Sequence, residues 1–310
     1  MTEDTYTHLV GITSIESITV IPTILLNALA IFAVTTRPPL RTKSNILLAC
    51  LAATDLFTGL VPKPLALAVS ITRILGVGKF CTLEKVFAIS LFFAGFASLT
   101  HLVLISIDRY VAIKDPLRYR DIVTKRRITA GVLLAWALSA SLTIQEIALA
   151  ALDSETDIYL SYLNVTDKVL AIFVSVCIGA IIYTYGYIFS ETRRQQKRLK
   201  LEQLSQEETK RIKKDKKAAN TLAIILATLV FTYLPALITL LLTTASYSIM
   251  ELRVKCNLWS GVLTFLSMGS VCNPFIYCWR NKKLRRSFLE ILHLRQPENR
   301  PPVIEMQVIN

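Results

Sequence analysis

The chain has 310 residues, of which 53% are hydrophobic, and its mean hydropathy is +0.50. This composition is too apolar for an ordinary soluble domain of this length and excludes that class. The net charge of +13 does not indicate nucleic-acid binding, because the basic residues gather between apolar stretches.

Seven apolar stretches are the main feature of the chain. Six contain no Asp, Glu, Lys or Arg, and the other is interrupted only by Asp55 and Lys63. Each is about long enough to cross ~30 Å of hydrocarbon at ~1.5 Å per helical residue. We predict an all-α membrane protein, a seven-transmembrane helix bundle. The stretches are 17–36, 44–72, 86–107, 128–145, 169–190, 218–250 and 256–279.

Basic residues fix the predicted orientation. Of the 35 Lys and Arg residues, 28 lie at Arg109 and in four segments, 37–43, 114–127, 193–217 and 280 onward. Positive charge collects on cytoplasmic loops and faces anionic lipid. We therefore expect a multi-pass plasma-membrane protein with the N-terminus outside and the C-terminus in the cytoplasm. Residues 1–14 lack a basic start before an apolar run, so no cleavable signal peptide is expected.

The predicted organisation has four parts. Residues 1–14 form a short extracellular N-terminus, and 15–279 form the transmembrane domain. Apolar and charged residues alternate near Phe288, which predicts a short cytoplasmic amphipathic helix over 280–294. Residues 295–310 are expected to be a disordered cytoplasmic tail.

Two helix ends carry the most informative motifs. Asp108, Arg109 and Tyr110 follow the uncharged stretch 86–107, so the charged pair lies at a membrane face, at the mouth of the bundle. Such a pair is well placed to be remade when the bundle changes shape. Asn273 and Pro274 lie at the same end of the last span, where a proline makes a candidate bending point.

Polar residues within the spans predict a buried cluster. Ionised Asp55 costs about 3 kcal/mol in the middle of a span, so it should face the interior and find partners. Together such groups would hold water or a small cation; the alternative is that they only hydrogen-bond the helices together. No spacing indicates any other metal site. The candidate partners are Asn27, Ser98, Ser270 and Asn273.

The expected outer face carries two further candidates. Asn164 begins an Asn-Val-Thr glycosylation pattern and is placed in the loop before the fifth span. Cys81 and Cys256 both fall at this face and are candidates for a disulfide, although the sequence does not show whether they approach each other. Lys63 also belongs to this face, either near a ligand or on a solvated rim.

In this order, each on its own helix, the motifs resemble those of rhodopsin-like G-protein-coupled receptors, over nearly the whole chain. The matching positions are Asn27, Leu51 to Asp55, Asp108 to Ile113, Pro116, Leu117, Trp136, Tyr185, Leu234, Pro235, Asn273 to Tyr277 and Asn281 to Arg285.

The resemblance implies a receptor that binds an extracellular ligand, moves its sixth span (218–250) outward and activates a heterotrimeric G protein. At rest, Arg109 would be held by Asp108 and by Asp215. On activation Arg109 would turn toward Tyr185 and Tyr277. It also implies that Leu117 inserts into the G protein, and that the Asp55 cluster binds an allosteric sodium ion. No other cofactor and no enzymatic activity are expected.

Departures from the family pattern concern the ligand. Glu84 stands where the family has a bridged cysteine, and Leu91 stands where amine receptors have an aspartate. The missing bridge and a missing proline in helix five are reminiscent of the melanocortin and lipid-receptor branches. An apolar pocket is expected, for a lipid-like or peptide ligand. Its residues are Leu91, Phe92, Gly95, Phe173, Tyr233, Ala236, Leu237, Leu240, Leu263 and Ser267.

The alternative is a seven-helix transporter or channel. Transporters often contain inverted repeats, and seven spans do not divide into two equal sets. A membrane enzyme is disfavoured because no pair of His or acidic residues within the spans suggests catalysis.

Overall fold

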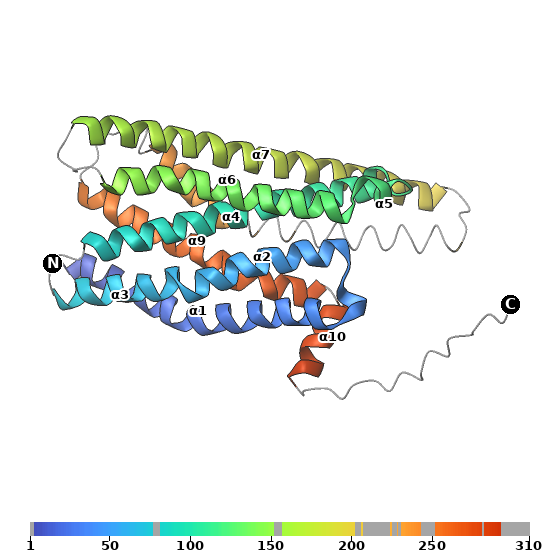
Figure 1. Ribbon diagram of the computed structural model, residues 1–310, viewed down its shortest axis with the longest axis horizontal. Helices are drawn as coiled ribbons and strands as arrows, with labels where there is room; N and C mark the ends of the chain where they lie inside the picture. Colours follow the sequence, from blue (N-terminus) through green and yellow to red (C-terminus); the bar gives the residue numbers. More distant parts are fainter. Residues whose placement is uncertain are drawn as a thin grey trace.

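The computed structural model describes residues 3–76, 81–151, 157–201, 231–242, 252–280 and 282–292, together with Gln206, Ile224 and Thr228. Within these ranges the regular structure is helical, and each of the seven predicted stretches contains helix. The long helices lie side by side in an elongated bundle (Figure 1). In chain order the elements are α1 Glu3–Thr36, η1 Pro38–Leu40, α2 Lys43–Leu60, α3 Pro62–Leu75, α4 Cys81–Lys114, α5 Tyr119–Ile122, α6 Lys125–Ala151, α7 Asp157–Leu201, Phe231–Leu242, α9 Leu252–Arg280 and α10 Lys282–Ile291.

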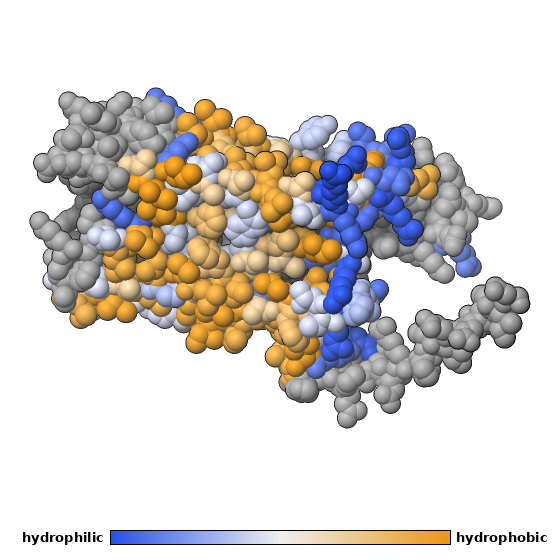
Figure 2. Space-filling view, viewed as in Figure 1, coloured by the Kyte–Doolittle hydropathy of each residue, from blue (hydrophilic) through white to orange (hydrophobic). Residues whose placement is uncertain are grey.

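The surface of the bundle is suited to lipid. Figure 2 shows hydrophobic residues covering its middle and hydrophilic residues gathered toward the end that carries α5. Large apolar side chains on the spans point outward; Ile18 is 73% exposed and Leu134 is 68% exposed. Side chains of this kind are compatible with hydrocarbon and unfavourable in water. Five helical segments are long and apolar enough to cross a membrane, and Phe231–Leu242 and Gly261–Ile276 are shorter apolar helices.

The second span is broken into α2 and α3. Pro62 and Pro64 follow Val61, whose φ of −121° and ψ of −68° are not helical. Proline has no N–H group and suits the first turn of a helix, so α3 starts anew at Pro62. The break places Lys63 in the first turn of α3, between two prolines.

Helix α4 is central, because it packs against α2, α3, α6, α7 and α9. Helix α1 packs against α2, α3 and α9. Helices α1 and α2 approach each other closely at Gly59, where a Cβ atom would lie 2.8 Å from Cγ1 of Ile24. Helix α10 turns away from the bundle axis (Figure 1) and buries Leu284 and Phe288.

Several boundaries differ from the predicted ones. Helix α1 begins at Glu3, so residues 3–14 continue the first helix. Helix α7 begins at Asp157, so Asn164 lies within a helix rather than in the predicted loop. The polar residues at the starts of α1 and α7 do not interrupt these helices, because polar side chains outside the hydrocarbon can bond to water while the backbone stays helical. The predicted tail, 295–310, lies outside the described residues.

Candidate functional site

The Asp108 carboxylate, at one end of α4, is buried and held by three donors. Arg109 Nε lies 2.9 Å from Oδ2, and the Ser44 hydroxyl also donates to Oδ2 at 2.9 Å. The Tyr119 hydroxyl donates to Oδ1 at 2.7 Å. Only 4% of Asp108 is exposed, and a buried carboxylate requires such partners. The predicted Asp108–Arg109 pair is therefore present, and we call this end of the bundle the Arg109 end.

Tyr119 is a site residue that the sequence reasoning missed. It lies in α5, and the Nζ atom of Lys43 lies 5.6 Å from its ring centroid. Burial, and secondarily the hydrogen bond to the Asp108 carboxylate, raise the pKa of Tyr119 above its ordinary value. The phenol therefore stays protonated at neutral pH and donates. No local motif marks a tyrosine at the start of a four-residue helix, so only the tertiary structure reveals this partner.

Other predicted members of this site lie nearby or outside the described side chains. Tyr110 packs on Tyr187, with ring centroids 4.8 Å apart, and Tyr185 is buried in α7. Leu117 is 88% exposed, which suits a side chain that contacts another protein. Asp215 and the side chain of Tyr277 lie outside the described part of the chain, so their roles stay predictions.

The predicted polar cluster assembles around Asp55, which is fully buried. Asn273 Nδ2 donates to Asp55 Oδ2 at 2.8 Å, and Asn27 Nδ2 donates to the Ser270 carbonyl at 2.9 Å. Ser98, Ser270 and Asn273 line one cavity, with about 450 Å³ of atom-free space including its mouth. All five predicted residues therefore lie in or beside one polar region between α1, α2, α4 and α9.

Two oxygens in this region fit a small cation or ordered water. Asp55 Oδ1 and Asn27 Oδ1 are buried and have no hydrogen-bond partner. Buried polar atoms of this kind are normally satisfied, and hard cations prefer carboxylate and amide oxygens. The described residues contain no group of three or more His, Cys, Asp or Glu side chains able to hold a metal ion. The oxygen donors suit sodium or water rather than a transition metal.

An apolar pocket lies farther from the Arg109 end. Including its mouth it contains about 540 Å³ of atom-free space, and its lining is almost entirely apolar. Eight of the ten predicted residues line it; Phe173 and Ser267 do not. Phe96, Leu170, Val174 and Leu266 were missed. The full lining is Leu91, Phe92, Gly95, Phe96, Leu170, Val174, Tyr233, Ala236, Leu237, Leu240, Leu263 and Leu266.

Tyr233 lies between the apolar pocket and the polar cavity. It lines both, and its hydroxyl donates to the Gly95 carbonyl of α4 at 2.9 Å. A molecule that fills the pocket would therefore contact a side chain that also borders the Asp55 region. This hydrogen bond joins the helix Phe231–Leu242 to α4 between the two cavities.

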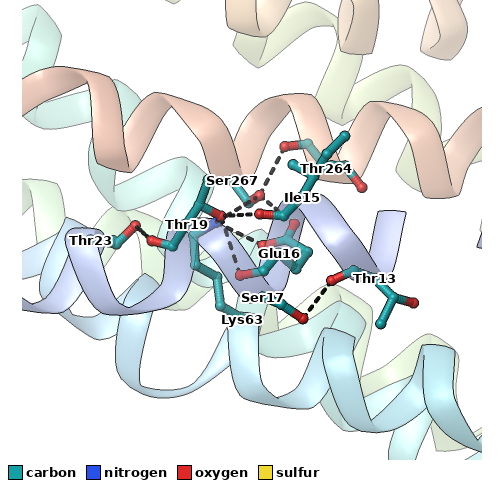
Figure 3. A network of polar contacts seen from close by, with 9 residues as sticks. All are labelled: Thr13, Ile15, Glu16, Ser17, Thr19, Thr23, Lys63, Thr264 and Ser267. Atoms are coloured by element: carbon teal, nitrogen blue, oxygen red, sulfur yellow. Dashed lines mark hydrogen bonds and ion pairs between the residues drawn. The ribbon is translucent and has the colours of Figure 1, made fainter. Parts of the chain in front are cut away.

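A buried ion pair was missed by the sequence reasoning (Figure 3). Lys63 Nζ donates to Glu16 Oε2 at 2.7 Å and to Thr19 Oγ1 at 2.8 Å. The placement of Lys63 on a rim is wrong, because its exposed fraction is 0%. Ser267 lies in this network instead of the pocket, with its hydroxyl 2.6 Å from Glu16 Oε1. The sequence held one signal for this ion pair: the acidic Glu16 directly precedes the apolar stretch 17–36, and the basic Lys63 lies within the stretch 44–72.

The remaining predicted features stay open. The side chains of Cys81, Cys256 and Asn164 lie outside the described part, so the disulfide and the glycosylation stay predictions. Glu84 forms an exposed ion pair with Arg73 at 2.9 Å.

Comparisons with known proteins identify the family. The model described as "7 transmembrane receptor (rhodopsin family)" matches residues 26–277. The chain is 28% identical to adenosine receptor A2a of Canis lupus familiaris, over 90% of this chain and 71% of that protein. It is also 28% identical to trace amine-associated receptor 5 of Mus musculus, over 93% and 86%. Dopamine receptor 4 of Caenorhabditis elegans is 28% identical over 56% of this chain and 35% of that protein.

The helical bundle, the Asp108–Arg109 pair and these matches agree. A transporter or channel is not favoured, since the relatives are receptors. The protein is a multi-pass membrane protein of the plasma membrane that signals through G proteins. The chain belongs to the rhodopsin family of seven-transmembrane receptors.

Proposed function

We propose that this receptor couples an extracellular ligand in the apolar pocket to G-protein activation at the Arg109 end. The coupling movement is an outward displacement of the sixth span, 218–250, which contains the helix Phe231–Leu242. The observation that carries the proposal is the buried Asp108 carboxylate, which holds Arg109 together with donors from α2 and α5. An arginine held in this way is unavailable to a partner until the contacts change. These contacts support our assignment of this arrangement to the resting receptor.

The distribution of charge supports the orientation. Basic residues gather at the Arg109 end, in the segments before α2, between α4 and α6, and in α10. Positive loops face the cytoplasm, so this end is cytoplasmic and the N-terminus is outside. The exposed Leu117 then lies where a G protein approaches.

The pocket favours an apolar, uncharged or lipid-like ligand. No charged side chain is among the described residues that line it, and Tyr233 contributes the one side-chain hydroxyl there. An ammonium group buried in this lining would lack a counter-charge, which is costly. The names of the relatives mention adenosine, trace amines and dopamine. The amines named for these relatives carry a positive charge, and the described lining of this pocket contains no acidic side chain to pair with it.

The Asp55 region would hold an allosteric sodium ion with water. Asp55 supplies a carboxylate oxygen and Asn27 an amide oxygen, both without hydrogen-bond partners. A bound cation would neutralise the charge of Asp55 in the resting bundle.

The first experiment measures G-protein dissociation in cells with a panel of sensors and no ligand. Arg109→Ala, matched for surface expression, is the control. A basal signal that falls in the variant supports the proposal and names the G-protein class. Panels of neutral lipids, peptides and amines then test the pocket; activation by amines alone would contradict the ligand class. A ligand-dependent signal that is unchanged in Arg109→Ala would overturn the role of the Arg109 end.

A further inference from the structure

The three helices α1, α3 and α9 meet at Glu16, Lys63 and Ser267, away from the Arg109 end (Figure 3). Their exposed fractions are 2%, 0% and 3%. The Lys63 ammonium has three oxygen partners, on Glu16, Thr19 and Ser267, the last at 3.3 Å. Both Glu16 oxygens also have partners. The charged groups of Glu16 and Lys63 therefore bond to residues of the protein itself, and we do not interpret this network as a ligand site.

A closed ionic network in the interior requires a physical reason. Moving two charges from water is costly, and replacing such a pair with apolar residues is often neutral or stabilising. The pair is therefore weak evidence for stability. Its well-attested use is to fix one arrangement of helices against others, because a buried charge that loses its partner is strongly disfavoured. Pro62 and Pro64 flank Lys63 and restrict its backbone, which suits a positioning role.

Ser267 belongs to a row of polar residues on α9. Ser267, Ser270 and Asn273 are spaced by three, so they lie along one side of the helix. Each bonds to another helix: Ser267 to Glu16, the Ser270 carbonyl to Asn27, and Asn273 to Asp55. The row ends directly before Pro274, which lies inside α9. The bond from Ser267 to Glu16 is thus the contact of this row that lies farthest from the proline.

We infer that Glu16 and Lys63 are positioning residues for receptor activation, which hold α9 in its resting register against α1 and α3 through Ser267. Displacing α9 along or about its axis would separate Ser267 from both charged partners. The free energy of the network therefore favours the resting state and sets the basal activity. This inference rests on the proposed resting state of the structure.

The test compares variants that neutralise the network with one that cuts only its link to α9. Single substitutions of Glu16 or Lys63 leave an unpaired buried charge and are expected to reduce surface expression. The double variant Glu16→Gln/Lys63→Met removes both charges and keeps the side-chain size. Ser267→Ala leaves the ion pair and removes the hydroxyl, so it remains informative if the double variant does not reach the surface. Arg73→Gln/Glu84→Gln, in an exposed ion pair, is the matched control.

Basal G-protein dissociation is measured per surface receptor for each variant. It is then divided by the signal of the wild-type receptor fused to its G protein, and this quotient is the ratio that the variants are compared by. We expect the ratio to rise at least about threefold in Ser267→Ala and in the double variant, and to stay unchanged in the control. Ser267→Thr, which restores the hydroxyl, should return the ratio toward wild type. A merely structural role would lower expression without changing the ratio. An unchanged ratio in Ser267→Ala at normal expression overturns the inference, whereas loss of all signal in the wild-type fusion would instead contradict the proposed function.

Discussion

Removing the Tyr119 hydroxyl tests the polar contacts at the Arg109 end. Tyr119→Phe deletes the donor that lies 2.7 Å from Asp108 Oδ1 and leaves Arg109 and Ser44 on Oδ2. Hydrogen bonds to charged groups contribute about 1.5–3 kcal/mol, and because Tyr119 is only partly buried the lower value applies. If activation breaks this bond, the resting state loses ~1.5 kcal/mol relative to the active state. That corresponds to about a tenfold change in their ratio.

The assay is basal G-protein dissociation per surface receptor, measured from pH 6 to 8.5. Burial raises the pKa of Tyr119 above its ordinary value, so the neutral donor is present at every pH below about 10. Its contribution is lost only as the pH rises through the raised value. We therefore expect a raised basal signal in Tyr119→Phe, by a factor that is constant across this pH range.

Tyr183→Phe is the matched control, because Tyr183 lies on the exposed side of α7 with 68% of its surface accessible. It should leave the basal signal unchanged. A basal signal in Tyr119→Phe that is equal to or below wild type would refute the role of this bond. A difference that disappears by pH 8 would refute the protonation argument.

Three further outcomes are expected. We expect purified receptor to melt at a higher temperature in sodium chloride than in choline chloride, and Asp55→Asn to abolish that increase because the carboxylate charge is lost; a retained increase would place the ion elsewhere. Gly59→Ala should lower the free energy of unfolding by about 1–3 kcal/mol, because its Cβ would meet Ile24, whereas Gly179→Ala, with nothing within 4 Å, should not. Thermal denaturation compares the two. Tyr233→Phe removes the bond to the Gly95 carbonyl and should alter the response to pocket ligands more than receptor expression, as concentration–response curves would show.

The spans could be predicted from the sequence because hydrocarbon excludes charge, so each span appears as a long stretch with few or no charged residues. Helix ends could not. Residues 3–14 and 157–168 are polar enough to lie in water, yet they continue α1 and α7, since nothing in their sequence ends a helix there. The Asp108–Arg109 contact was predictable because the two residues are neighbours. Ser44 and Tyr119 reach the same carboxylate from other helices, which no local pattern indicates.

Eight of the ten residues that the family resemblance assigned to a pocket line one apolar cavity, and their role in binding a ligand stays a prediction. Ser267 was misplaced because its position depends on what faces it across the α1–α9 contact. There, Glu16 and Lys63 come together only after the break at Val61 restarts the helix at Pro62.

Three buried acids, Glu16, Asp55 and Asp108, lie at successive levels of the bundle, and each bonds to a residue from another helix. In lipid, apolar packing gives helices little preference for one register, because the tails are as apolar as the side chains. Polar contacts then decide which arrangement is favoured. If all three bias one two-state equilibrium, the free-energy changes of Tyr119→Phe and Ser267→Ala should add in the double variant, since the two sites share no partner. Basal signals that multiply within about twofold support this single equilibrium. A double variant no more active than either single variant would show that the two ends of the bundle respond to separate transitions.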